Sequence, residues 1–185
     1  PFNNILDKNS KILVLREQGI GDEILYGTMY FDLLNEFSYL TIECDERLIP
    51  LFKNSFPSHK EKFNKLGTYS SNENKINSFE HIIYAGSLGK YFRNDLNSFL
   101  QNSYLKSIDN YKDIELEHIL DKSKGLKIGI SWKSFKNRYS SEKSLSLEDF
   151  DNIFKIKDSI IFNLQYGDIK KELKSFGKKY NYKII

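Results

Sequence analysis

The segment 11–35, KILVLREQGIGDEILYGTMYFDLLN, constrains the fold more than any other part of the chain. It begins with an apolar run that includes Ile12 and Val14 and passes through a turn with Gly19 and Gly21. It then continues as an apolar stretch long enough for about four helical turns. This order predicts a strand, a glycine turn and a helix. In an open α/β sheet, ligands bind beyond the carboxyl end of such a strand, where helix N–H groups and the helix dipole converge.

Strand-like and helix-like segments alternate along the rest of the chain. We expect strands at 39–44, 80–84, 126–132, 158–164 and 182–185, a weaker strand at 63–66, and helices at 109–122, from 146 onward, and at 168–179. The alternation predicts an α/β protein with parallel sheets and right-handed crossovers. We expect two Rossmann-like units, at 1–122 and 123–185. The second opens a new strand at the chain end, so we expect a piece of a longer protein.

Charge and apolar patterning limit the partners. The net charge is +3 and the basic residues are dispersed, so we expect no nucleic-acid partner. No apolar run approaches the ~18 residues of a membrane span, and no signal sequence opens the chain, so we expect no transmembrane segment. The single cysteine, Cys44, excludes an intramolecular disulfide. It fits a reducing, cytoplasmic location and is expected in the core.

No metal site is expected. The three histidines, His59, His81 and His118, lack ligand spacing. The Asp149-Phe-Asp151 triplet resembles a metal motif of some sugar transferases, but it falls in the first turns of the helix that starts after Ser146. There Asp149 is expected to act in a capping box with Ser146.

The glycine turn supplies the first candidate site. Asp22 follows the turn, and two interpretations of it stay open. It is either a helix cap, worth ~1 kcal/mol, or a general base that takes a proton from a sugar hydroxyl. The neighbouring residues of the expected acceptor site are Gln18, Gly19 and Gly21, with Ser87 from the small-residue turn after the strand at 80–84.

A dinucleotide-binding fingerprint fits the same turn only in part. The pattern G-x-G-x-x-G requires glycine where Ile24 stands. Glu43 or Asp45 does lie near the position expected for a ribose contact. NAD binding therefore remains a minor alternative.

The loop after the strand at 126–132 supplies the second candidate site. It carries Ser131, Lys133, Arg138, Lys143 and Ser144. Cations and hydroxyls before a capped helix, beyond a parallel strand, are the groups that bind a diphosphate. An exposed basic loop without a ligand is the alternative.

Four ordered blocks carry a family resemblance: REQGIGDEILYGTMYFDLL, TIECDERLIPLFKNSFP, KIGISWKS with KSLSLEDF, and FNLQYGD. Together they resemble the glycosyltransferase-like domain that follows tetratricopeptide repeats in many bacterial proteins. That domain is related to the ADP-heptose:lipopolysaccharide heptosyltransferases and, more distantly, to O-GlcNAc transferases. The resemblance runs from about residue 11 to 168 and is weak between 58 and 105.

The resemblance implies a two-lobed GT-B architecture, with an acceptor lobe followed by a lobe for a nucleotide-diphosphate sugar. It maps the family's catalytic base onto Asp22 and its donor-diphosphate residues onto Ser131, Lys133 and Lys143. Inverting transfer without a metal or other cofactor is implied, to a glycan, lipid or protein acceptor. Tetratricopeptide repeats are expected in the parent chain. The family's later D-T-x-x-x-H-like segment is absent here, so we expect weak or no catalysis by this piece alone.

In the resulting mechanism, Asp22 deprotonates the acceptor hydroxyl, while Lys133, Arg138 and Lys143 stabilise the leaving diphosphate. A non-catalytic binding module beside helical repeats is the alternative from another functional class.

Overall fold

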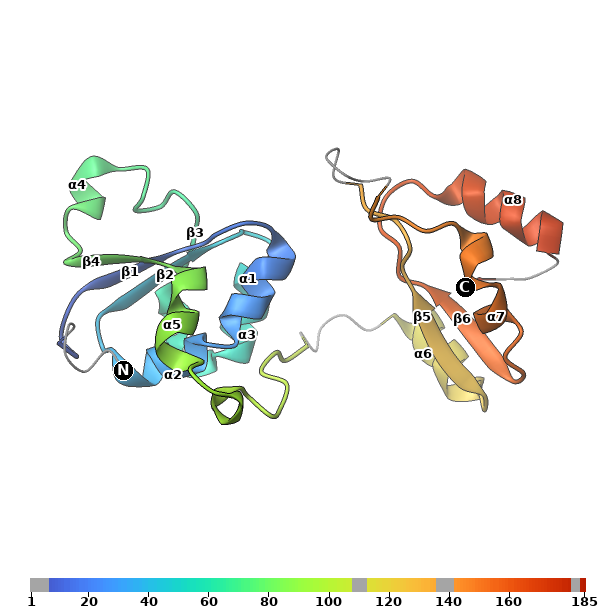
Figure 1. Cartoon of the computed structure of the whole chain (residues 1–185), viewed down its shortest axis with the longest axis horizontal. Helices are drawn as coiled ribbons and strands as arrows, with labels where there is room; N and C mark the ends of the chain where they lie inside the picture. The colour runs from blue at the N-terminus through green and yellow to red at the C-terminus, as the bar shows by residue number, and fades with distance from the viewer. Residues whose placement is uncertain (1–6, 108–112, 136–141, 181–183) are drawn as a thin grey trace. The chain divides into compact units, whose positions relative to one another are not determined.

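The computed structural model describes residues 7–107, 113–135, 142–180 and 184–185. The chain divides into two compact units, residues 1–111 and 112–185 (Figure 1). Helix α6 (Ile114–Lys122) belongs to the second unit, so the observed division precedes this helix, whereas the sequence-based boundary follows it.

The first unit is built on a four-stranded parallel sheet in the order β3-β2-β1-β4. Its strands are β1 (Ile12–Leu15), β2 (Leu40–Cys44), β3 (Phe63–Lys65) and β4 (His81–Tyr84). Each strand begins or ends within about a residue of the expected positions. The mixed α/β fold with a parallel, Rossmann-like sheet is therefore confirmed.

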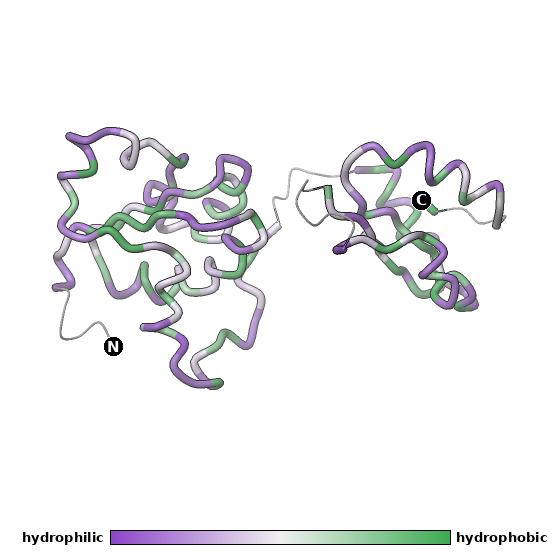
Figure 2. The backbone as a smooth tube through the Cα atoms, turned by 45° about the horizontal axis from the view of Figure 1, so that its top comes forward, coloured by the Kyte–Doolittle hydropathy of each residue, from purple (hydrophilic) through white to green (hydrophobic). Residues whose placement is uncertain are grey.

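Short helices connect these strands. They are α1 (Ile20–Gly27), α2 (Tyr30–Glu36), α3 (Ile49–Ser55), α4 (Glu73–Ile76) and α5 (Gly89–Phe92), with 3₁₀ turns η2 (Pro57–Lys62), η3 (Ala85–Leu88) and η4 (Leu96–Ser98). Apolar side chains of β1 and β2 pack against α2 and α3 in one buried cluster. Figure 2 shows this concentration of apolar residues on the central strands, with hydrophilic loops around them.

The helix expected to run unbroken from the glycine turn is interrupted after Gly27, so this expectation was wrong. The Thr28 N–H bonds to the Leu25 carbonyl, one residue short of the α-helical partner. The Ile24 carbonyl, which Thr28 would have bonded, instead accepts the Tyr104 hydroxyl at 2.6 Å. Gly27 makes room for this tyrosine, because a Cβ there would lie 2.5 Å from the hydroxyl. A residue far along the chain therefore contacts the backbone where α1 ends.

The second unit contains a two-stranded parallel sheet of β5 (Leu126–Ile130) and β6 (Ser159–Asn163). The unit also contains turn η5 (Leu147–Phe150), helix α7 (Asp151–Phe154) and helix α8 (Lys170–Tyr180). The expected last strand lies partly outside the described residues. Its final residue, Ile185, exchanges backbone hydrogen bonds with Ile161 and Asn163 of β6.

Among the residues that the structure describes, no helix has the length and apolar character needed to cross a membrane.

Replacing Gly27 with alanine should lower the free energy of unfolding by about 1–3 kcal/mol, because the new methyl group overlaps the Tyr104 hydroxyl and lies tightly against Phe52. Alanine's better helix propensity, worth ~1 kcal/mol, should not compensate. Gly21→Ala in the same helix is the control, since a Cβ there meets nothing within 4 Å. Urea unfolding of both variants tests this, and equal effects would contradict it.

Candidate functional site

The first candidate site lies at the carboxyl edge of the first sheet. Strand order places the topological switch point between β1 and β4, whose ends pair as Leu15 with Tyr84. The segments that follow these strands are tied together, because the Gly86 N–H donates to the Glu17 carboxylate at 2.7 Å. A Cβ at Gly86 would lie 2.6 Å from the carboxylate oxygen, so a larger residue there would make the Glu17 side chain shift. In parallel α/β sheets ligands bind at such a point.

The predicted residues of this site gather at that edge. Asp22 lies in the first turn of α1, and its Oδ2 accepts the Gly19 N–H at 2.9 Å. Gln18 is exposed and has a φ of +62°, a conformation that is uncommon for a residue with a side chain. Gly21 and Ser87 are exposed on α1 and η3, which pack together. The capping contact of Asp22 is thus present, and its role as a base stays a prediction.

A largely buried network of ion pairs supports the glycine turn. Arg16 Nε lies 2.8 Å from Oε1 of the fully buried Glu23, and its Nη1 lies 3.0 Å from Asp45 Oδ2. The remaining Arg16 nitrogen donates to the Gln18 carbonyl at 3.0 Å. Glu23 also accepts the Asp45 N–H at 2.8 Å. One guanidinium therefore connects the ends of β1 and β2 to the backbone of the glycine turn.

The acids of this network are shifted in opposite directions. Burial raises the pKa of Glu23, and the hydrogen bond from the Asp45 N–H and the charge of Arg16 only partly offset it. Hydrogen bonds from the Arg47 side chain and backbone hold the pKa of Asp45 below its usual range. The network therefore keeps a carboxylate at Asp45 and favours the protonated form of Glu23 more than water does.

A second buried carboxylate, Glu43, organises the loop after β3. It is fully buried and accepts four hydrogen bonds, from the N–H groups of Gly67, Tyr69 and Ser70 and from the Ser70 hydroxyl. Burial alone would raise the pKa of Glu43, but these four bonds together lower it. Glu43 and Asp45, the two candidates for a ribose contact, are both engaged in bonds within the protein.

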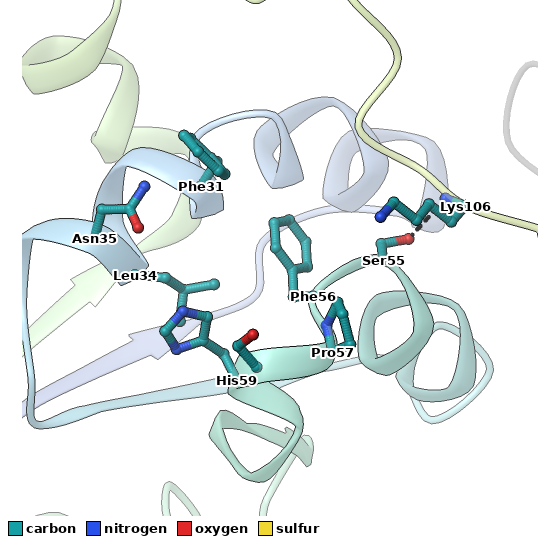
Figure 3. A pocket seen from close by; sticks show the side chains of 9 residues that line it. Phe31, Leu34, Asn35, Ser55, Phe56, Pro57, His59 and Lys106 are labelled. Carbon is teal, nitrogen blue, oxygen red and sulfur yellow. Dashed lines mark hydrogen bonds between the residues drawn. The ribbon is translucent and has the colours of Figure 1, made fainter.

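A cavity of the first unit lies away from this site. A cavity of about 310 Å³ is lined by residues of α2, of the end of α3 and of η2, and by Lys106, and Figure 3 shows it around Phe31 and Phe56. The Lys106 N–H donates to the Ser55 hydroxyl at its rim. Because α2 and α3 end where the chain turns to enter β2 and β3, this cavity lies at the amino edge of the sheet. Asp22 lies at the opposite edge, so the cavity does not include the predicted site.

The second candidate site is the loop after β5, which is held by one glutamine from the end of β6. Oε1 of Gln165 accepts the N–H groups of Trp132 and Lys133, at 2.8 and 2.6 Å, and the Ser131 hydroxyl at 3.2 Å. The Ser134 N–H donates to the Ser144 hydroxyl at 3.0 Å, which brings the two ends of the loop together. Ser131, Lys133 and Ser144 therefore share one region.

The cations of this loop differ in their surroundings. Lys133 Nζ lies 2.6 Å from Glu172 of α8, whose other oxygen accepts the indole N–H of Trp132 at 3.1 Å. Lys143 is exposed in the turn beside Ser144. Arg138 lies outside the described residues.

The structure also bears on the residues considered as metal ligands or as a nucleophile. Among the described residues, no group of three or more His, Cys, Asp or Glu side chains is placed to hold a metal ion. Asp149 accepts the N–H and the hydroxyl of Ser146, as expected for a capping residue. Cys44 is a buried core residue, as expected, and burial raises the pKa of its thiol to about 12.

Sequence reasoning missed the residues that hold both sites in place. Arg16 and Glu23 flank the glycine turn, and Gln165 lies in the block FNLQYGD. The available signal was the presence of charged or amide residues next to apolar strands, where burial requires a partner. Glu172 gave no such signal, because it lies in a charged helix.

Among curated proteins, the chain is similar to Protein FlbA of Caulobacter vibrioides, with 23% identity over 186 residues. The match covers 93% of this chain and 31% of that protein, so the chain spans about a third of the relative's length. No family model matches the chain, and no solved structure matches it significantly.

Replacing Glu43 with glutamine should lower the free energy of unfolding by roughly 3 kcal/mol, because an amide cannot accept all four bonds. Since the pKa of Glu43 is lowered in the folded state, its contribution is present above the ordinary value of 4.5 and is lost as the pH falls below it. The variant should therefore lose less stability on acidification than the natural protein. Glu61→Gln, at an exposed side chain, is the control. If the free energy of unfolding of E43Q and of the natural protein falls equally as the pH is lowered, Glu43 does not have this role.

Proposed function

We propose that this chain is a glycosyltransferase-like domain that acts in inverting, metal-independent transfer of a sugar from a nucleotide-diphosphate donor to an acceptor hydroxyl. One observation carries the proposal. In each of the two α/β units, the residues with the required chemistry follow the first strand at its carboxyl end: Asp22 after β1, and Lys133 after β5. This is the position at which parallel α/β sheets bind ligands.

Asp22 is the proposed base. The first turn of a helix stabilises a negative charge, and the Gly19 N–H fixes the carboxylate in one orientation. Asp22 takes the proton of the acceptor hydroxyl as the oxygen bonds to the anomeric carbon of the donor. The bond from that carbon to the phosphate oxygen breaks, and the diphosphate leaves with the electron pair. The configuration at the anomeric carbon is inverted.

Lys133 is the proposed partner of the leaving diphosphate. Its ammonium is a compact cation suited to phosphate, and exposed Lys143 lies at the end of the same loop. Glu172 now holds the ammonium, so a phosphate oxygen must replace or join this carboxylate. We include Ser131, Ser144 and Arg138 in the donor site, the last on sequence grounds alone.

Two alternative functions are NAD binding and a non-catalytic interaction module. Binding of NAD would need a free acid for the ribose, and Glu43 and Asp45 are engaged with neighbouring groups. A non-catalytic interaction module remains the rival, and nucleotide binding separates it from a transferase. We also propose that the parent protein acts in the cytoplasm and carries tetratricopeptide repeats.

Asp22→Asn should lower turnover by at least 100-fold, because asparagine can still accept the Gly19 N–H but cannot take a proton. The release of nucleoside diphosphate from UDP-, GDP- and ADP-sugars by the protein that carries this chain measures the effect. The melting temperature should change little. Asp22→Ala, which removes the cap as well, should cost about 1 kcal/mol of stability. If D22N retains full turnover, Asp22 is only a cap.

Lys133→Ala should weaken binding of a nucleoside diphosphate about tenfold, through loss of one charge-assisted contact. The only tryptophan, Trp132, is buried beside Lys133, so its fluorescence reports a titration with UDP, GDP or ADP. The matched control is Lys127→Ala, which removes the same charge from an exposed position on β5. If the natural chain binds none of the three nucleotides, the interaction-module interpretation replaces the transferase.

A further inference from the structure

The Gln165 side chain makes an unusually complete set of hydrogen bonds. In addition to the three bonds that its Oε1 accepts, its Nε2 donates to the carbonyls of Lys133 and Tyr166, both at 3.0 Å. The side chain is almost fully buried. Because its oxygen faces donors and its nitrogen faces carbonyls, only one orientation of the amide satisfies all its partners.

These bonds act on the backbone of one residue in particular. Lys133 is held by Gln165 at both its N–H, at 2.6 Å, and its carbonyl, at 3.0 Å. The same residue presents its ammonium to Glu172. Lys133 lies beyond the end of β5 at Ile130, and the glutamine supplies its backbone with an acceptor and a donor, as a neighbouring strand does within a sheet.

The location of Gln165 follows from the sheet. Ile130 pairs with Asn163, and the Leu164 N–H continues the ladder to the Ile130 carbonyl. Gln165 comes next, and its own N–H donates to the Asn163 side chain at 2.9 Å. The end of β6 therefore places the Gln165 side-chain amide, in one fixed orientation, against the loop that carries Lys133.

We propose that Gln165 is a positioning residue for diphosphate binding, which fixes the backbone of Lys133 so that its ammonium is held at the carboxyl end of β5. This inference rests on the proposed function. Gln165 itself need not touch the donor. It acts by holding the Lys133 backbone in one conformation before the diphosphate binds, so that less conformational entropy is lost on binding.

Gln165→Glu tests this with a change of one atom. The carboxylate can still accept the Trp132 and Lys133 N–H groups, but its second oxygen then faces two carbonyls. At pH 8, UDP should bind about tenfold more weakly than to the natural chain, as measured by Trp132 fluorescence. At lower pH the new carboxyl group takes up a proton and can donate to a carbonyl. The ratio of the two dissociation constants at each pH should therefore fall towards one. Gln101→Glu, at an exposed glutamine, is the control and should show no such trend.

A double-mutant cycle separates positioning from general support of the fold. If Gln165 acts through Lys133, then Q165E should cost less than twofold when Lys133 is already alanine. Should Q165E fail to fold, as judged by circular dichroism, Gln165→Met replaces it in the same cycle, with the loss then independent of pH. A loss that is the same with or without Lys133 overturns the inference, as does unchanged binding by Q165E. Either result leaves the proposed function intact, whereas failure of the natural chain to bind any nucleoside diphosphate overturns both.

Discussion

Parallel strand pairing is the constraint on which the rest of the structure depends. Two parallel strands cannot be joined by a tight hairpin, so the chain must leave each strand, cross the sheet and return. The first unit does this through α1 and α2 between β1 and β2, and through α3 between β2 and β3. Every strand therefore ends at the same edge. Residues that are distant in sequence, such as Glu17 and Gly86, meet there without any local signal.

Buried polar side chains hold that edge in shape. The segments that follow parallel strands have backbone N–H and carbonyl groups without ladder partners, and burial makes an unpaired group costly. Glu23 and Glu43 supply acceptors in the first unit, and Gln165 supplies both an acceptor and a donor in the second. The Glu43 carboxylate suits a loop that presents several N–H groups. The neutral amide suits a loop that presents N–H and carbonyl groups together.

The two candidate functional groups are themselves engaged in such contacts. Asp22 accepts a backbone N–H, and Lys133 pairs with Glu172. Contacts of this kind hold a side chain in one orientation and reduce the entropy lost when a ligand binds. At the proposed donor site they would also compete with the ligand, because Glu172 already pairs with the Lys133 ammonium that the phosphate would contact. The affinity of the proposed donor site would therefore depend on the balance between orientation and competition.

The sequence by itself determined the α/β class and the approximate positions of its strands, because apolar runs bounded by turns are local signals. It also located Asp22 and Lys133 after strand ends, since this depends only on order along the chain. Tertiary structure alone decided that Tyr104 bonds to the last turn of the first helix and that Gln165 supports Lys133. These contacts join residues far apart in sequence, and their formation depends on strand register and packing, which no local pattern of residues encodes.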